Sequence, residues 1–173
     1  MRLEENAVIQ EGLFNAERLV PHRHGMKLIK RIKKPAQQGF QAETTVSESW
    51  PMYERGAVSS IICVELIAQS VSAFATWLRG PNAIPRIGLL VGIKRADFST
   101  ATMPIDIDLT ITVDEISRLG NYGIFKGEVA SHSTSFCSAV IQALDPDRSI
   151  LEKINEQTPV LGGKSMRFLE NDE

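Results

Sequence analysis

The stretch 56–81, GAVSSIICVELIAQSVSAFATWLRGP, most constrains how this chain can fold, because apart from an arginine near its end it carries one charged side chain, Glu65. The pattern predicts a helix that starts after Gly56, has Ser59 and Ser60 in its first turn, and stops at the closing Gly-Pro pair. Apolar residues occur on every side of this helix, so we expect it to be buried all round rather than amphipathic.

Glu65 and Gln69 are four positions apart, which places them on one face of the helix, one turn from each other. Burial raises the pKa of a carboxyl group, and a pKa near neutrality suits a general acid or base. A structural acid that pairs with a basic neighbour is the competing interpretation. A membrane span is disfavoured, because Glu65, Gln69 and the interior serines would be costly in a bilayer.

The composition bounds the class of protein. A chain of 173 residues, 43% of them hydrophobic, is long enough for one domain with a core, which excludes wholesale disorder. The net charge of -2 gives no indication of a nucleic-acid partner. Cys63 and Cys137 are expected to be reduced and buried, and no cluster of metal ligands is evident. The first ten residues lack the pattern of a secretory signal, so we expect a cytoplasmic protein.

Several segments alternate or concentrate apolar residues as strands do, and the last ones follow each other closely enough to form an antiparallel meander. The expected strands are 26–32, 38–48, 86–98, 105–113, 122–130 and 136–144, with 86–98 in the centre of the sheet and bulges or close backbone approach at Gly88 and Gly92. These elements predict an α+β fold in which an antiparallel sheet wraps around one long buried helix. The domain would span 19–145, after an N-terminal extension, 1–18, and before a tail or loosely docked helix, 146–173. Because one small sheet cannot cover such a helix, we expect a homodimer whose sheets join edge to edge.

Four segments of the chain resemble the hotdog-fold family of 3-hydroxyacyl-acyl carrier protein dehydratases and their aryl-polyene relatives. VPHRHGMKLIKRI (20–32) resembles the opening of that family, and VELIAQS (64–70) resembles its central helix. VGIKRADF (91–98) and YGIFKGEVA (122–130) resemble two of its strands. Their order and spacing agree from about Leu19 to Leu144, which implies a hotdog fold with the family's helix acid at Glu65.

The loop before the helix departs from the dehydratase pattern. The family usually places a histidine about a dozen residues before the helix acid, whereas SWPMYERGAVSS (49–60) has none: Pro51 stands at the histidine's place, and Val58, Ser59 and Ser60 replace Met-Pro-Gly. The aryl-polyene relatives also lack this histidine while they keep the opening Pro-His and the helix acid. The resemblance is closest to them, and it implies His22 as the base.

The resemblance implies dehydration of a 3-hydroxyacyl thioester to a trans-2-enoyl thioester, or the reverse hydration, in fatty-acid or aryl-polyene synthesis. His22 would be the base, Glu65 the acid, and Gln69 would orient Glu65 or a water. Backbone N–H groups at Ser59 and Ser60 would hold the thioester oxygen. No metal or resident cofactor is implied, because phosphopantetheine on the acyl carrier protein carries the substrate. The exposed basic residues expected to dock this acidic partner are Lys30, Arg31, Lys33, Lys94 and Arg95.

Two further hypotheses fit the same residues. A thioesterase would need only Glu65 to activate water, and the missing loop histidine would not matter. A non-catalytic hotdog subunit that pairs with an active homologue would explain why that histidine is absent.

Overall fold

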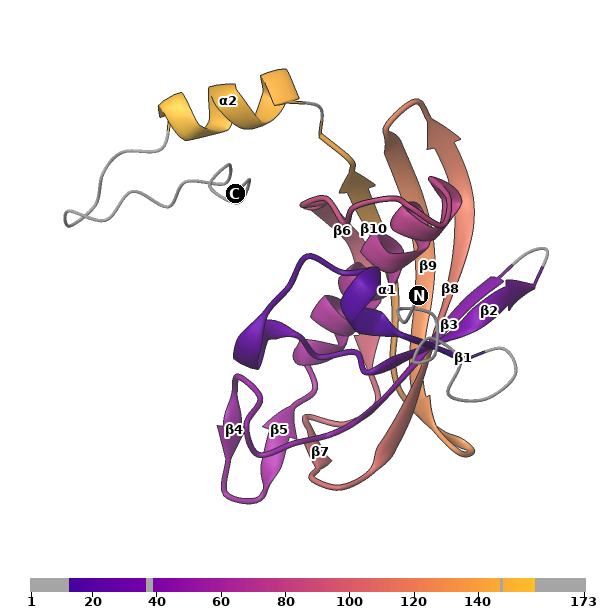
Figure 1. Cartoon of the computed structure of the whole chain (residues 1–173). Helices are drawn as coiled ribbons and strands as arrows, with labels where there is room; N and C mark the ends of the chain where they lie inside the picture. The colour runs from indigo at the N-terminus through magenta and orange to yellow at the C-terminus, as the bar shows by residue number, and fades with distance from the viewer. Residues whose placement is uncertain (1–12, 37–38, 147, 158–173) are drawn as a thin grey trace.

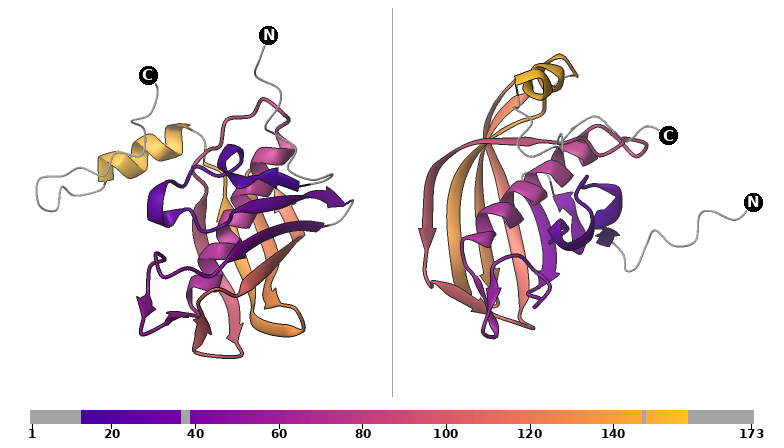
Figure 2. Two further views of the ribbon diagram at one scale, coloured as in Figure 1. Left: turned by 60° about the horizontal axis from the view of Figure 1, so that its bottom comes forward. Right: turned by 90° about the vertical axis from the view of Figure 1, so that its left-hand side faces the viewer.

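The protein is described by a computed structural model that covers residues 13–36, 39–146 and 148–157, and its centre is a curved antiparallel sheet that wraps around helix α1 (Figures 1 and 2). The seven strands of this sheet lie in the order β1-β2-β3-β8-β9-β10-β6. They are β1 (Leu13–Asn15), β2 (Arg31–Ala36), β3 (Gly39–Thr45), β6 (Leu89–Phe98), β8 (Asp108–Leu119), β9 (Tyr122–Ser131) and β10 (Thr134–Leu144). The expected α+β class, with an antiparallel sheet around one long helix, is confirmed.

Shorter elements connect the main sheet and the helix. A second small sheet has the order β4-β5-β7, with β4 (Tyr53–Glu54), β5 (Ala57–Ser59) and β7 (Thr102–Pro104). Two 3₁₀ turns, η1 (Ala16–Arg18) and η2 (His24–Met26), lie between β1 and β2. Helix α2 (Arg148–Gln157) follows the end of β10, inside the segment expected to be a tail or a docked helix. Among the described residues, no helix combines the length and apolarity needed to cross a membrane.

Helix α1 (Ile62–Leu78) packs its apolar side chains against the concave face of the sheet. Leu66 and Ile67 are fully buried there, together with Ile111 of β8 and Ile141 of β10. Gly127 of β9 lets the helix approach closely, because a Cβ at this position would lie 2.4 Å from the Ile67 side chain. Of the alternating strand predicted at 105–113, the part from Asp108 onward lies in β8, where Leu109, Ile111 and Val113 are buried in the core. Ile105 and Ile107 precede this strand.

The predicted start of the helix is wrong. Residues 53–59 form the β4–β5 hairpin, and α1 begins at Ile62, so Ser59 ends a strand and Ser60 precedes the helix. The two turn residues of the hairpin, Arg55 and Gly56, have φ angles of 51° and 84°, as a type I′ turn requires. Pairing of β5 with the distant β7 stabilises this hairpin, and such a partner is not evident from local sequence.

Two strand predictions also need correction. The strand expected at 26–32 begins only at Arg31, because Met26 belongs to the η2 turn. The strand expected in the centre of the sheet, β6, lies at its edge within a single chain. The expected irregularities in β6 are present: its pairing with β10 shifts register at two places, and a Cβ at Gly92 would lie 2.4 Å from the Gln142 side chain.

Candidate active site

A cavity of about 210 Å³ runs along one face of α1, between the helix and strands β6, β9 and β10. The helix contributes a stripe of residues at helical spacing that includes Glu65, Ser72 and Arg79. Small side chains such as Ala68 and Ala75 lie between them and leave the space open. From Glu65 to Arg79 the helix rises about 21 Å, so the cavity has two well-separated ends.

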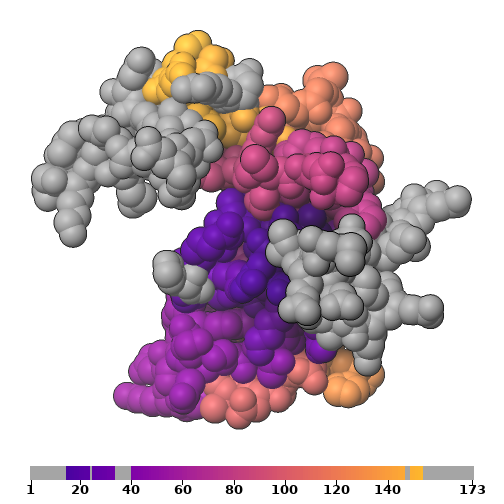
Figure 3. Space-filling view, in the orientation of Figure 1, coloured from indigo at the N-terminus to yellow at the C-terminus, as the bar shows by residue number. Residues whose placement is uncertain are grey.

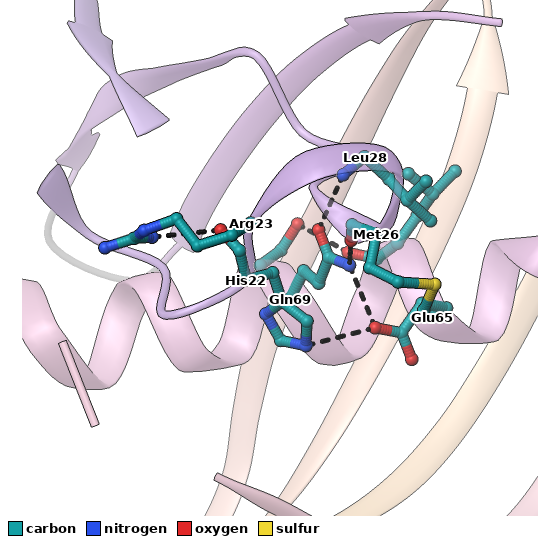
Figure 4. Close-up of polar contacts among 8 residues, drawn as sticks. His22, Arg23, Met26, Leu28, Glu65 and Gln69 are labelled. Atoms are coloured by element: carbon teal, nitrogen blue, oxygen red, sulfur yellow. Dashed lines mark hydrogen bonds and ion pairs between the residues drawn. The ribbon is translucent and has the colours of Figure 1, made fainter. Parts of the chain in front are cut away.

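Gln69 connects the helix to the loop after η2, and it is fully buried. Its Oε1 accepts from the Leu28 backbone N–H at 3.0 Å, while its Nε2 donates to the Met26 carbonyl at 2.7 Å and to Glu65 Oε1 at 2.9 Å (Figure 4). A buried amide with these three partners has one orientation. Gln69 therefore fixes both the loop and the Glu65 carboxyl group, and the backbone partners Met26 and Leu28 were not apparent from sequence.

His22 lies beside Glu65 in the same chain. Its Nε2 is 3.4 Å from Glu65 Oε1, and the two side chains are 31% and 30% exposed. Arg23 donates to the His22 and Val20 carbonyls, at 2.9 and 2.8 Å, and so braces the backbone of the loop that carries the imidazole (Figure 4). The structure thus brings together three side chains that the sequence placed in the site: His22, Glu65 and Gln69.

The two nitrogens of His22 have different surroundings. Nε2 faces Glu65, whereas Nδ1 is buried and has no hydrogen-bond partner among the described residues. Burial lowers the pKa of His22; the Glu65 carboxylate opposes this effect, and Arg23 adds to it. The imidazole is therefore neutral at neutral pH, and its Nε2 is the atom that can exchange a proton with Glu65.

Ser59 and Ser60 lie outside this arrangement. The Ser59 N–H donates to the Met52 carbonyl at 3.3 Å, and the Ser60 N–H donates to the Ala101 carbonyl at 2.9 Å. Ser59 is the last residue of β5 and Ser60 lies in the turn before α1, and neither lines the cavity. The oxyanion-binding role predicted for their N–H groups rested on the wrong helix start, and the structure does not support it.

The five basic residues predicted to dock a carrier protein do not form one patch within a chain. Lys30 precedes β2 and Arg31 and Lys33 lie in it, near one edge of the sheet, whereas Lys94 and Arg95 lie in β6 at the opposite edge. Arg31 and Lys33 pair with Glu43 at 3.8 and 2.9 Å, and Arg95 pairs with Asp97. The basic residues that do line the cavity, Arg79, Arg86 and Arg118, were missed because they come from three separate segments and form no sequence motif.

A family model for the ApeP-like proteins, described as ApeP dehydratase, matches residues 14–155. The chain belongs to the ApeP-like dehydratase family. The match includes the His22 loop, α1 and every strand of the main sheet except the first residue of β1, and it confirms the resemblance to hotdog dehydratases of the aryl-polyene type. No curated protein matches the sequence.

Solved structures confirm the hotdog fold. The dehydratase heterocomplex ApeI:P from Xenorhabdus doucetiae has a TM-score of 0.73 and 18% identity, over 82% of this chain and 98% of that one. An uncharacterised protein from Pyrococcus horikoshii has a TM-score of 0.53 and 16% identity, over 78% and 96%. A hypothetical thioesterase with coenzyme A from Streptococcus pneumoniae has a TM-score of 0.51 and 16% identity, over 66% and 84%. At these identities the structures establish the fold that this ApeP-like chain shares with them.

Proposed function

We propose that this chain removes water from a 3-hydroxyacyl thioester to give a trans-2-enoyl thioester, or catalyses the reverse hydration. The contact between His22 and Glu65 at one end of the cavity carries this proposal, because the reaction needs one group that accepts a proton and one that donates a proton. The family assignment supports dehydratase chemistry. The substrate would be carried on the phosphopantetheine of an acyl carrier protein, in fatty-acid or aryl-polyene synthesis in the cytoplasm, with no metal or resident cofactor.

In this mechanism His22 Nε2 removes the proton beside the thioester carbonyl, and Glu65 protonates the departing hydroxyl group. The carbon–oxygen bond breaks, water leaves, and the electron pair of the broken carbon–hydrogen bond becomes the new double bond. Afterwards His22 is protonated and Glu65 is ionised. His22 Nε2 and Glu65 Oε1 lie 3.4 Å apart, so a small movement lets the imidazole return this proton to the Glu65 carboxylate.

Gln69 acts as a positioning residue in this mechanism. Its Nε2 donates a hydrogen bond of 2.9 Å to Glu65 Oε1, the same oxygen that faces His22. The other carboxyl oxygen has no hydrogen bond from a described residue. The free oxygen is the one available to the substrate hydroxyl. Because Gln69 is held by the loop backbone, it keeps this orientation without the substrate.

The test is hydration of a trans-2-enoyl thioester by the purified protein, followed by loss of the conjugated thioester absorbance and by mass. Dehydratase activity predicts that the product gains one water and keeps its thioester. Release of free thiol would instead show a thioesterase. Absence of both reactions for the chain alone directs the test to a second subunit.

A partner subunit is supported by the edge strand β6. Four apolar side chains of this strand are exposed in the single chain: Leu90 at 42%, Val91 at 51%, Ile93 at 51% and Phe98 at 41%. An apolar edge strand is a template for pairing with another sheet, so we propose that β6 joins the corresponding strand of a second hotdog subunit. That subunit is either a second copy or a homologue.

If the second subunit is a homologue, a second candidate function follows: this chain would support an active partner without catalysing the reaction itself. The similar structure from Xenorhabdus doucetiae is a heterocomplex, and this chain lacks a histidine between residues 49 and 60. Activity that appears only after co-expression with another hotdog chain, and that survives Glu65→Gln in this one, would establish the supporting role. Full activity of the pure homodimer would exclude it.

A further inference from the structure

The end of the cavity opposite the His22–Glu65 pair is an arginine-lined mouth, made by Arg79 at the end of α1, Arg86 in the loop before β6, and Arg118 of β8. The Arg86 and Arg118 residues are exposed, so this end opens to solvent. The space-filling view shows the outer surface at the end of the molecule where α1 and the β8–β9 turn lie (Figure 3). A substrate that is attached to a carrier protein can enter the cavity only through an end that opens to solvent.

Two of the three arginines already have carboxylate partners. Arg79 Nη1 donates to Asp145 Oδ2 at 2.7 Å, and Arg118 donates to Glu115 Oε2 at 2.8 and 2.6 Å through Nε and Nη2. Arg86 has no ion pair or hydrogen bond with a described side chain. Three guanidinium groups against two carboxylates leave one net positive charge at the mouth, and Arg86 is the side chain that is free to bind.

The loop that carries Arg86 is held in place. Arg79 Nη2 donates to the Ile84 carbonyl at 3.3 Å and to Thr76 Oγ1 at 3.1 Å, which ties the loop to the last turn of α1. Pro85 restricts the backbone immediately before Arg86. The C-terminus of α1 carries a partial negative charge, and the Arg79 guanidinium offsets it. The mouth can therefore accept an anion despite its place at this end of the helix.

We infer that Arg86, supported by Arg79 and Arg118, binds the phosphate of a phosphopantetheine arm whose thioester reaches the His22–Glu65 pair. Guanidinium groups bind phosphate oxygens through paired, charge-assisted hydrogen bonds. The arm is a long chain with its phosphate at one end and its thioester at the other, which matches a cavity whose charged mouth and acid–base pair lie about 21 Å apart along α1. The inference rests on the proposed acyl-thioester substrate, and it assigns the end by which that substrate enters.

The experiment compares two ligands that differ only in the phosphate: the hexanoyl thioesters of 4′-phosphopantetheine and of pantetheine. Hexanoyl chains have no double bond to hydrate, so calorimetry measures binding without turnover. We expect the wild-type Kd to be about tenfold lower with the phosphate, a difference that shrinks at high salt. Arg86→Ala should bring the ratio of the two Kd values close to one, and Arg86→Lys should retain part of it.

Arg55→Ala is the matched control, because Arg55 is 89% exposed in the β4–β5 turn and does not line the cavity. It should keep the wild-type ratio. A wild-type ratio close to one, or an Arg86→Ala ratio equal to that of the wild type, would overturn the inference. Because binding is measured apart from catalysis, a chain that discriminates the phosphate but hydrates no enoyl thioester, alone or with a second hotdog subunit, would contradict the proposed function and leave the anion site standing.

Discussion

The two ends of the cavity along α1 hold their charged groups in different ways. At one end Glu65 is only 30% exposed and contacts both His22 and the buried Gln69 amide, which in turn is bound to the loop backbone. At the other end Arg86 is exposed, and its guanidinium has no partner among the described side chains. A partly buried carboxyl group that is held by hydrogen bonds has one geometry, which suits proton transfer. An exposed guanidinium group suits binding of an anionic ligand, and salt screens its attraction for that ligand. Substitutions at the two ends should therefore affect different kinetic parameters.

The largest contrast is expected for His22→Ala. Loss of the imidazole, which in the hydration direction donates the proton to the carbon beside the thioester carbonyl, should lower kcat by about 10² to 10⁴-fold, with a much smaller change in KM. His132→Ala is the control, because His132 lies exposed in the β9–β10 turn away from the cavity. Steady-state kinetics with the same substrate checks the difference. Equal loss in both variants would remove His22 from the reaction.

A smaller effect on activity, together with a loss of stability, is expected for Gln69→Leu. The change leaves the buried Leu28 N–H without its acceptor, which should cost about 1–3 kcal/mol of unfolding free energy, and it frees the Glu65 carboxyl group. The denaturant concentration at the midpoint of unfolding and kcat should both fall. Gln41→Leu is the control, since the Gln41 amide makes a long 3.5 Å contact with Thr112. A stable Gln69→Leu protein with wild-type kcat would show that the brace does not matter.

The smallest expected effect is a shift in the titration of His22, followed by NMR. Burial holds the His22 pKa below its ordinary value of about 6.5, and Glu65 partly opposes this. Replacing Glu65 by Gln should therefore lower the pKa of His22 further. In the wild type, kcat/KM for dehydration should fall as the pH drops below about 6.5, because Nε2 becomes protonated and can no longer accept the substrate proton. A His22 pKa that rises in Glu65→Gln would contradict the contact.

The His22–Glu65 end of the cavity could largely be predicted from sequence, because its key spacing is local. Glu65 and Gln69 face the same way in any helix that contains both, wherever that helix begins. Placement of His22 beside them came from the family resemblance, and the structure adds that the pair lies within one chain. The Ser59 and Ser60 prediction failed because the helix start depends on β7, more than forty residues away along the chain.

The arginine mouth could not be predicted for a related reason. Arg79, Arg86 and Arg118 belong to a helix end, a loop and a strand, and only the packing of α1 and this loop against the sheet brings them together. The edge position of β6 shows the same limit: its apolar run indicates burial, but whether its neighbour belongs to the same chain or to a partner is not encoded locally. The prediction that residues 1–18 form an extension falls mostly outside the described residues.

The central claim, that His22 and Glu65 together perform the proton transfers, is tested most directly by Glu65→Gln in the hydration of a trans-2-enoyl thioester. The amide keeps the size of the side chain but cannot take the proton from the attacking water, which is the role of Glu65 in the hydration direction. The claim predicts that the wild type hydrates the substrate, that Glu65→Gln loses about 10² to 10⁴-fold in kcat, and that the exposed control Glu54→Gln does not. Folded Glu65→Gln protein that retains the wild-type rate would contradict it.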